Sequence, residues 1–294
     1  MNSYYTRTDL ASECTASYAA VADTDGFRFE SKKSRGFDVS VLDIINEQGA
    51  RSIGKPRGRY ITVSIGKIWH SDDDTFSRCS ALISDCLCRL SEKVMCKEKP
   101  DNILVAGLGN RYITSDAIGH ETLKNVIVTR HLKDLDKNLY DALGSTSVSA
   151  ITPGVIGQTG IETLELIRGA VKDVKPDIVI VIDALVARDL GHLATTVQIT
   201  DSGIAPGSGI GNRRHAINRE SLGCPVLAIG VPTVVESSTL VYSALEKAGI
   251  TDISSSLKNV LDNGRSFFVT PKESDTITIE VSRLIADSIN MFVS

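Results

Sequence analysis

The sequence predicts a single α/β domain built on a mostly parallel twisted sheet with helices covering both faces. Three short apolar runs rich in β-branched residues support this fold class, at residues 103–107, 178–188 and 225–232. Such runs are typical of strands buried on both faces, and helical patterns alternate with them as in βαβ units. At 294 residues with 42% hydrophobic residues, the chain is long enough to bury one such core.

The chain before the first run divides into a leader and the beginning of the domain. Residues 1–35 are polar, and their apolar residues show no sustained helical or strand periodicity. We therefore expect a mobile or peripherally docked leader, followed by an α/β domain over 36–294. The elements expected next are an outer strand or short helix at 37–45, a strand at 60–65 and a helix at 74–97 that Pro100 ends.

The chain after residue 107 continues the alternation of helix and strand. We expect a helix at 117–135 with Leu123, Ile127 and Val128 facing the sheet, and we expect no regular structure in the Gly-rich loop at 152–163. The remaining expected elements are a strand at 147–151, a helix at 162–174, strands at 178–188 and 195–199, a strand at 225–232 closed by Pro232, and a last helix that places Ile277, Val281, Leu284, Ile285 and Ile289 on one face.

Charge and composition argue against several classes of protein. The net charge of -4 argues against binding of nucleic acid by electrostatics, and short basic clusters such as Lys55, Arg57 and Arg59 are more typical of solvated loops. The N-terminus lacks the apolar core of a signal peptide, and no window approaches the roughly 20 apolar residues of a membrane span. We therefore expect a cytoplasmic protein without membrane or nucleic-acid partners.

The six cysteines indicate neither a zinc site nor a disulfide framework. Four of them fall within one expected helix, and none forms the paired CxxC spacing of a zinc site. Cys79 and Cys86 are seven residues apart and would share a helix face as small apolar core residues. Reduced structural thiols are the expected state.

Two aspartates, Asp116 and Asp183, stand out because each follows an apolar strand. The carboxyl ends of parallel strands line the crevice where ligands bind, so the two side chains can converge there. Two close carboxylates cannot both ionise cheaply, so one would keep a proton while the other activates water. The structural alternative is that each carboxylate caps the helix that follows it. The residues alone leave both interpretations open.

Other chemistries fit the sequence less well. The turn after residue 107 has Tyr112 where a dinucleotide fingerprint needs its third glycine, and the Gly-rich loop at 201–212 has no Walker A lysine. Pro206 stands where the nucleophile elbow of an α/β-hydrolase needs glycine. His120 and Glu121 follow Asp116 closely enough to suggest a metal site. The sequence does not identify three suitably placed ligands, so we expect no metal or other cofactor.

Seven sequence blocks occur in an order and spacing that resemble the germination protease family of spore-forming Firmicutes. The blocks cover most of the chain from about residue 100 onward, and they read GLGNRYITSDAIG, VTRHL, TPGVIGQTGIET, PDIVIVIDALVAR, TTVQITDSGIAPGSGIGN, PVLAIGVPTVV and VTPKESD. A more distant similarity, confined to the GxGN turn and the strand with its aspartate, is to hydrogenase maturation endopeptidases. Both resemblances imply an α/β, phosphorylase/hydrolase-like fold. The resemblance to hydrogenase maturation endopeptidases also implies a metal-guided substrate.

The resemblance implies an atypical aspartic-type endopeptidase that degrades small acid-soluble spore proteins in the spore core during germination. It implies a homotetramer made as a self-processing zymogen, with Asp116 and Asp183 as the catalytic pair. Its substrates are cut after the acidic residue of a Thr-Glu-aliphatic-Ala-Ser-Glu type sequence, and residues 8–13, TDLASE, nearly repeat it. The resemblance therefore predicts a propeptide of residues 1–9, cleaved between Asp9 and Leu10.

Further residues and alternatives accompany this prediction. Asn110, His120 and Arg188 are expected as supporting or substrate-contact residues. His120 stands where the family usually has proline, and the segment at 235–268 is shorter than in bacillus members. The alternatives are a metal-dependent maturation endopeptidase and a non-catalytic peptide-binding relative. Taken alone, TDLASE would be a helix start.

Overall fold

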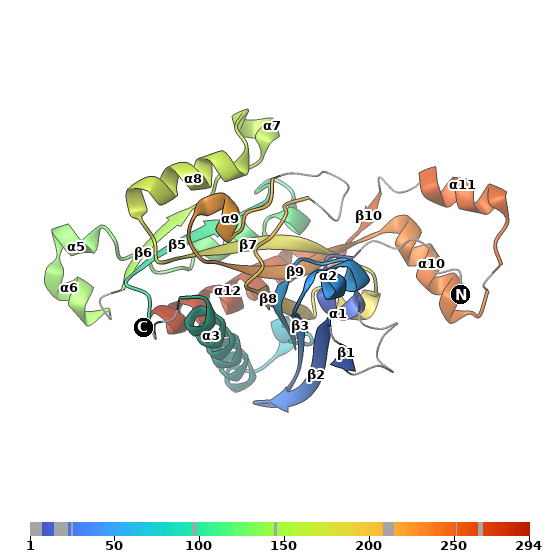
Figure 1. Cartoon of the computed structure of the whole chain (residues 1–294), viewed down its shortest axis with the longest axis horizontal. Coiled ribbons are helices and arrows are strands. Elements are labelled where there is room, and N and C mark those ends of the chain that lie inside the picture. Colours follow the sequence, from blue (N-terminus) through green and yellow to red (C-terminus); the bar gives the residue numbers. More distant parts are fainter. Residues whose placement is uncertain are drawn as a thin grey trace.

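The computed structural model describes residues 8–14, 23–24, 26–95, 97, 99–143, 146–207, 215–250, 252–263 and 267–294. Within this part of the chain, ten strands form one sheet in the order β1-β2-β3-β4-β8-β9-β7-β5-β6, and β10 pairs with β9 (Figure 1). The strands are β1 Asp23–Thr24, β2 Phe27–Ser34, β3 Phe37–Ile44, β4 Gly58–Ser64, β5 Asn102–Gly107, β6 Ser147–Ile151, β7 Ile178–Ala187, β8 Thr196–Thr200, β9 Val226–Glu236 and β10 Phe268–Val269.

The sheet has a parallel half and an antiparallel half. Strands β6, β5, β7 and β9 are parallel, while β8, β4, β3, β2 and β1 continue the sheet with antiparallel pairs. The parallel half consists of the apolar runs predicted from the sequence, joined by helical crossovers. The α/β class is therefore confirmed, with a mixed sheet.

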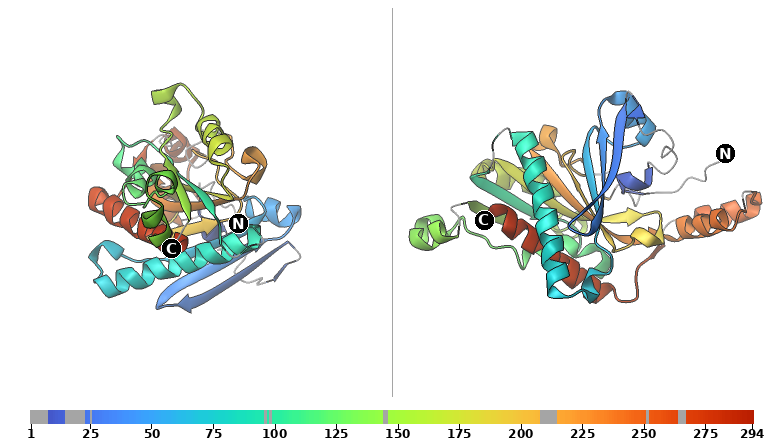
Figure 2. Two further views of the ribbon diagram at one scale, coloured as in Figure 1. Left: turned by 90° about the vertical axis from the view of Figure 1, so that its left-hand side faces the viewer. Right: turned by 90° about the horizontal axis from the view of Figure 1, so that it is seen from below.

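Helices cover both faces of the parallel half. Their bounds are α1 Ala11–Cys14, α2 Glu47–Ile53, α3 Asp73–Met95, α4 Ile118–Leu123, α5 Leu132–Leu135, α6 Lys137–Ala142, α7 Ile156–Thr159, α8 Thr163–Val174, α9 Arg219–Leu222, α10 Ser237–Lys247, α11 Ser255–Asn263 and α12 Ser274–Val293. The described residues also form the 3₁₀ turns η1 Ile68–His70, η2 Thr114–Asp116 and η3 Leu190–His192. Figure 2 shows α3 and α12 side by side across one face, and Figure 1 shows α8 and α9 over the other.

Alternation along the strands divides the core between these two faces. Ile178, Ile180 and Ile182 of β7 pack with α3 and α12, whereas Val179 and Val181 pack with α8. This is the period of two that a strand buried on both faces requires. It also fixes the side of β7 on which the next odd-numbered residue, Asp183, projects.

The cysteine helix agrees with the sequence prediction. It runs from Asp73 to Met95, and Cys79 and Cys86 are buried in the core as free thiols. Burial raises the pKa of Cys79 to about 12 and that of Cys86 to about 11. Both thiols are therefore uncharged core residues.

The helix expected at 117–135 is not continuous: it ends at Leu123, and only the single turn α5 follows at Leu132–Leu135. The chain leaves the helix because its polar groups find partners elsewhere: the side chain of Asn290 accepts from the amide of Ile127, and the amides of Thr129 and Arg130 donate to β6. Ile127 is 48% exposed instead of facing the sheet. The apolar spacing could not reveal these long-range partners.

Three other expectations need correction. Strand β9 does not close at Pro232 but continues to Glu236, because the missing N–H of proline falls where the pairing with β7 shifts register between Leu185 and Val186. The Gly-rich loop at 152–163 contains the one-turn helix α7, which Gly160 ends with a positive φ of 70°. The segment expected as leader includes β2, which pairs along its length with β3.

Candidate active site

Asp183 lies within β7, at the point where β5 stops covering its edge. The last pair between the two strands joins Gly107 to Ile182, and Asp183 is the next residue. On the other side it pairs with Gly230 of β9, and its carboxylate accepts from the amide of Ala184 at 3.0 Å. The residue is 6% exposed. A buried acid therefore stands in a strand whose odd-numbered side chains face away from α3 and α12.

Asp116 ends the short turn η2, which follows β5 by a tight loop. Its carboxylate accepts from the backbone amide of Asn110 at 2.8 Å, which closes the loop on itself. Gly109 has a φ of 95°, and a Cβ there would lie 1.9 Å from the carbonyl oxygen of Asp116. Only glycine leaves room for this closure. The loop is anchored to β7 by the amide of Leu108, which donates to the carbonyl of Ile182 at 2.8 Å.

Neither aspartate caps the helix that the sequence offered as an alternative. The N-cap of α4 is Ala117, and Asp183 is followed by four more strand residues. The structure instead places both aspartates at the carboxyl end of β5, one in the loop that follows it and one on the neighbouring strand. This end of a parallel sheet is where ligand crevices form.

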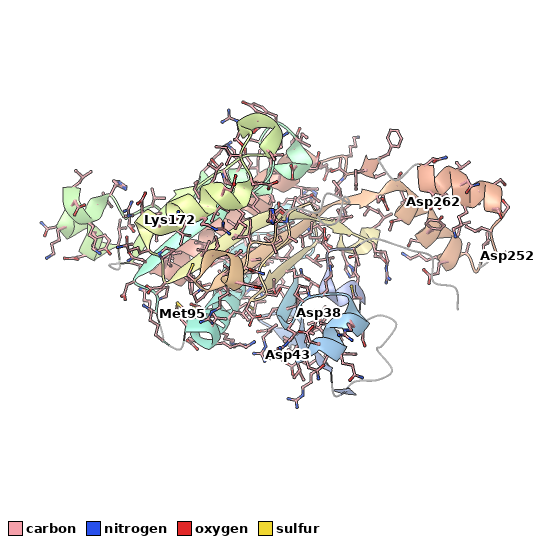
Figure 3. The ribbon with its side chains drawn as sticks, turned by 45° about the horizontal axis from the view of Figure 1, so that its top comes forward. Asp38, Asp43, Met95, Lys172, Asp252 and Asp262 are labelled. Atoms are coloured by element: carbon pink, nitrogen blue, oxygen red, sulfur yellow. The ribbon has the colours of Figure 1, made fainter. Side chains whose placement is uncertain are left out.

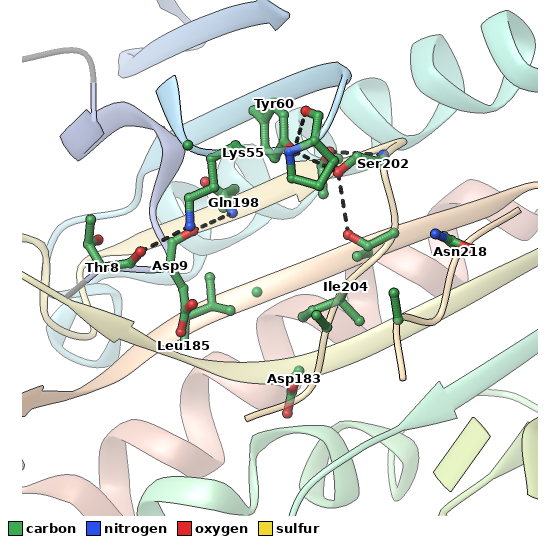
Figure 4. Close-up of a pocket in the computed structure, with 18 of the residues that line it drawn as sticks. Thr8, Asp9, Lys55, Tyr60, Asp183, Leu185, Gln198, Ser202, Ile204 and Asn218 are labelled. Atoms are coloured by element: carbon green, nitrogen blue, oxygen red, sulfur yellow. Dashed lines mark hydrogen bonds between the residues drawn. The ribbon is translucent and has the colours of Figure 1, made fainter. Parts of the chain in front are cut away.

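A cavity of about 650 Å³ opens over β7, β8 and β9 beside Asp183. It is polar along one side, where the hydroxyl of Ser202 donates to that of Tyr60, and burial raises the pKa of Tyr60 to about 12. Asp116 is not one of its lining residues. Figure 4 labels ten of the residues that line it: Thr8, Asp9, Lys55, Tyr60, Asp183, Leu185, Gln198, Ser202, Ile204 and Asn218.

The N-terminal segment forms part of the wall of this cavity through Thr8 and Asp9, and hydrogen bonds hold it there. The amide of Asp9 donates to the carbonyl of Val186 at 2.8 Å, and the amide of Val186 donates to the Asp9 carboxylate at 3.0 Å. Gln198 of β8 accepts from the amide of Ala11 at 2.7 Å. It also donates to the carbonyl of Asp9 at 3.4 Å (Figure 4). The ammonium group of Lys55 donates to the carbonyl of Thr8 at 2.9 Å. Lys55 therefore holds a peptide and is not a solvated loop residue.

The apolar side chains of the same segment are fully enclosed. Leu10 is 0% exposed and packs against Leu185, Leu193 and Val235 at the end of β7 and β9. Ala11 is also 0% exposed and packs in a second cluster with Phe27, beneath the antiparallel strands. The peptide bond between Asp9 and Leu10 thus lies where the segment enters the body of the protein.

Glu13 anchors the far end of the segment. Its carboxylate is 3% exposed and accepts from the amides of Arg188 at 2.7 Å and Asp189 at 2.9 Å, from Nδ1 of His192 at 2.8 Å, and from the hydroxyl of Thr8. Burial by itself would raise the pKa of this carboxyl. The hydrogen bonds outweigh that effect, the one with His192 most, and hold the pKa of Glu13 below its usual value. The bond to Glu13 in turn raises the pKa of His192.

The remaining candidate residues occupy different positions. Asn110 supports the Asp116 loop through its amide, and its side-chain oxygen accepts from Gln158 at 2.8 Å. Arg188 follows β7 and meets the N-terminal segment through its backbone amide. His120 lies half-buried on α4. Within the described residues, no group of three or more His, Cys, Asp or Glu side chains could hold a metal ion.

The sequence did not reveal the residues that receive the segment. Gln198 and His192 come from a strand and a turn nearly two hundred residues away from it, and nothing in their local pattern marks them. The nearest signal was the hexapeptide TDLASE itself, whose two acidic side chains are the ones that bind backbone amides. Its partners required the fold.

Comparison with known proteins gives consistent matches. A family model described as "Germination protease" matches residues 7–248. Relatives named germination protease are 39% identical in Clostridium perfringens, covering 98% of this chain and 95% of the relative. One from Caldanaerobacter subterraneus subsp. tengcongensis is 38% identical over 97% and 93% of the two chains. One from Bacillus subtilis is 40% identical over 84% of this chain and 67% of its own length.

Among solved structures, the chain is similar to the NiFe hydrogenase maturation protease HycI from Thermococcus kodakarensis. The two are 18% identical, and the match covers 67% of this chain and 97% of that one with a TM-score of 0.35. In the described part of this chain, none of the helices has the length and apolar character needed to cross a membrane.

Proposed function

Because this chain belongs to the germination protease family, and is therefore a peptidase, we propose that it degrades small acid-soluble spore proteins when spores germinate. It acts in the spore core, as a zymogen that processes itself between Asp9 and Leu10. Residues 1–9 are the propeptide, and the catalytic domain comprises residues 36–294 together with β2, which pairs with β3. The observation that carries the proposal is that Thr8 and Asp9 line the same cavity as Asp183, while β7 and Gln198 hold the segment through hydrogen bonds to Asp9 and Ala11.

The reaction is hydrolysis of a peptide bond by water between two carboxyl groups. Asp116 and Asp183 share one proton, and the ionised member takes a proton from water as that water attacks the carbonyl carbon of Asp9. The protonated member gives its proton to the nitrogen of Leu10 as the C–N bond breaks. The products are a carboxylate on Asp9 and an amine on Leu10. The step uses the chain's own acids and no cofactor.

Two features support the roles of the supporting residues. The amide of Asn110 holds the Asp116 carboxylate in one orientation, which a proton-transfer group needs. The amide of Arg188 holds the segment on the far side of the bond to be cut. His120 lies on α4, which begins two residues after Asp116, and is the third supporting residue proposed.

We also propose that the protein is a homotetramer. Helices α10 and α11 project from the body as an arm, which carries Asp252 and Asp262 in Figure 3. The arm and the strand that follows it expose apolar side chains, including Leu257, Val260 and Phe268. Exposed apolar groups gathered on a projecting element are typical of an interface.

Digestion of a purified small acid-soluble spore protein tests the proposed function. Wild-type protein is expected to cut it after the acidic residue of its Thr-Glu-aliphatic-Ala-Ser-Glu type sequence, as read by mass spectrometry of the fragments. Asp116→Asn and Asp183→Asn should each lower the rate at least about a hundredfold, since each removes a proton-transfer group. Asp173→Asn changes an exposed acid of α8 and is the matched control. Equal rates in all four proteins would rule out the aspartate pair.

A further inference from the structure

The contacts around residues 8–13 distinguish groups that hold any peptide from groups that select its side chains. Gln198 and Lys55 bind carbonyl and amide groups of the segment backbone, so they would hold a peptide of the same backbone conformation whatever its side chains. The amides of Arg188 and Asp189 and the imidazole of His192 bind only a side-chain carboxylate, that of Glu13. The groove that holds residues 8–13 therefore contains a specific subsite for one side-chain carboxylate.

We propose that this groove binds peptides in trans, and that the Arg188 and Asp189 amides with His192 form a subsite for an acidic side chain. The acid lies four residues beyond the first acidic residue of the bound peptide, as Glu13 lies beyond Asp9. This inference rests on the proposed function and deepens it, because it assigns the residues that read the far end of a substrate. Residues 8–13 are then the first peptide to occupy the groove, and peptides that bind later make the same contacts.

The burial of Glu13 indicates how selective this subsite is. A carboxylate removed from water is costly unless hydrogen bonds replace its hydration, and here two amides, an imidazole and the Thr8 hydroxyl do so. All of these groups are donors, if His192 carries its proton on Nδ1. A glutamine side chain would turn its own NH₂ donors toward them. The subsite therefore discriminates glutamate from its neutral isostere.

The apolar contacts define the spacing between the two acids. Leu10 is fully buried against Leu185 of β7 and Val235 of β9. Ala11 is fully buried in the cluster around Phe27, where a longer side chain would meet its neighbours. The peptide that fits has an acid, an aliphatic residue, a small residue, one further residue and a second acid. The groove is free for such a peptide only after the chain's own segment has left it.

Fluorescence anisotropy with two labelled hexapeptides tests the subsite. The probes are Thr-Asp-Leu-Ala-Ser-Glu and the same peptide ending in Gln, and the protein is the full chain carrying Asp183→Asn, which prevents their cleavage. Adding Glu13→Gln weakens the chain's own segment as a competitor. On that protein the Glu peptide should bind at least about tenfold more tightly than the Gln peptide, since hydrogen bonds to charged groups are the strong ones.

Three further variants make the test specific. Adding His192→Ala should reduce the preference for the Glu peptide to less than about threefold, whereas His131→Ala, at an exposed histidine near α5, should leave it unchanged. Thermal unfolding of each protein checks its fold. If Glu13→Gln does not fold, Leu10→Ala weakens the same segment without altering the subsite.

The outcomes separate this inference from the proposed function. Equal binding of the two peptides, or no binding of either, overturns the subsite even if wild-type protein still cuts between Asp9 and Leu10. Selective binding that depends on His192, with no cleavage by wild-type protein under any condition, supports the subsite and overturns the protease mechanism. Binding requires no chemistry, so the two results are independent.

Discussion

Glu13 and His192 make the docking of the N-terminal segment depend on pH. The pKa of Glu13 is held below its usual value of 4.5, so its contribution is present above that value and is lost as the pH falls through the lowered pKa. The pKa of His192 is raised above 6.5 by the same bond, so its contribution is fully present below 6.5 and is lost as the pH rises through the raised pKa. The segment is therefore held most firmly between these two limits.

Hydrogen–deuterium exchange of residues 8–14 across pH tests this account. Protection, corrected for intrinsic exchange, should be greatest between about pH 4.5 and 6.5 and should fall on both sides. His192→Asn should remove the decrease on the alkaline side and leave the acidic one. The neighbouring Asp189, paired with Lys247 at 3.2 Å, keeps a lowered pKa and does not titrate within this window. Protection that is constant across pH would contradict the pairing.

Gly109 is the residue on which the Asp116 loop depends. A Cβ at this position would lie 1.9 Å from the carbonyl oxygen of Asp116, and the φ of 95° is strained for any side chain. Gly109→Ala should therefore displace Asp116, destabilise the protein by at least about 1 kcal/mol and abolish cleavage. Gly169→Ala, on α8 with open space around it, should keep full activity. Denaturant unfolding and a cleavage assay on both variants measure the difference.

At the scale of elements, the helix α3 carries much of the core on one face of the sheet. Leu87 is 0% exposed within that core. Leu87→Ala should lower the free energy of unfolding by about 2–5 kcal/mol, because it removes buried methyl groups and leaves a cavity. Leu135→Ala, at a side chain that is 78% exposed on α5, should change it by less than about 0.5 kcal/mol. Urea unfolding followed by circular dichroism distinguishes the two.

The elements with a strong period were predictable, and those shaped by distant partners were not. Strand β7 and helix α12 carry their apolar pattern in the sequence, and both were found where it predicts them. The end of α4 and the continuation of β9 past Pro232 depend on Asn290 and on a register shift against β7. Such partners are set by the fold, so no local window contains them.

The candidate site shows the same division. Both aspartates could be singled out because each follows an apolar run in the sequence. The structure places Asp183 inside β7 rather than after it, and places both aspartates at the carboxyl end of β5. The groove could not be predicted, since Gln198, Lys55 and His192 reach the N-terminal segment from three separate parts of the chain. Their joint action follows from the fold, in which β9 lies between β8 and β7 in the sheet.

At the scale of the whole molecule, the projecting arm of α10 and α11 is the expected interface. Mass photometry of the purified protein should give a tetramer. Val260→Asp introduces a charge on the arm at a side chain that is 66% exposed, so it should shift the population toward smaller species without unfolding the subunit. A monomer at every concentration would contradict the homotetramer, and a tetramer unaffected by Val260→Asp would place the interface elsewhere.

The most direct test of the account is the intact mass of the purified full chain after incubation at mildly acidic pH, with and without a chelator. Wild-type protein and the Asp173→Asn control should lose residues 1–9 by cleavage between Asp9 and Leu10. Asp116→Asn and Asp183→Asn should keep them, and the chelator should have no effect. Equal processing in all four proteins, processing at another bond, or none under any condition would contradict the account.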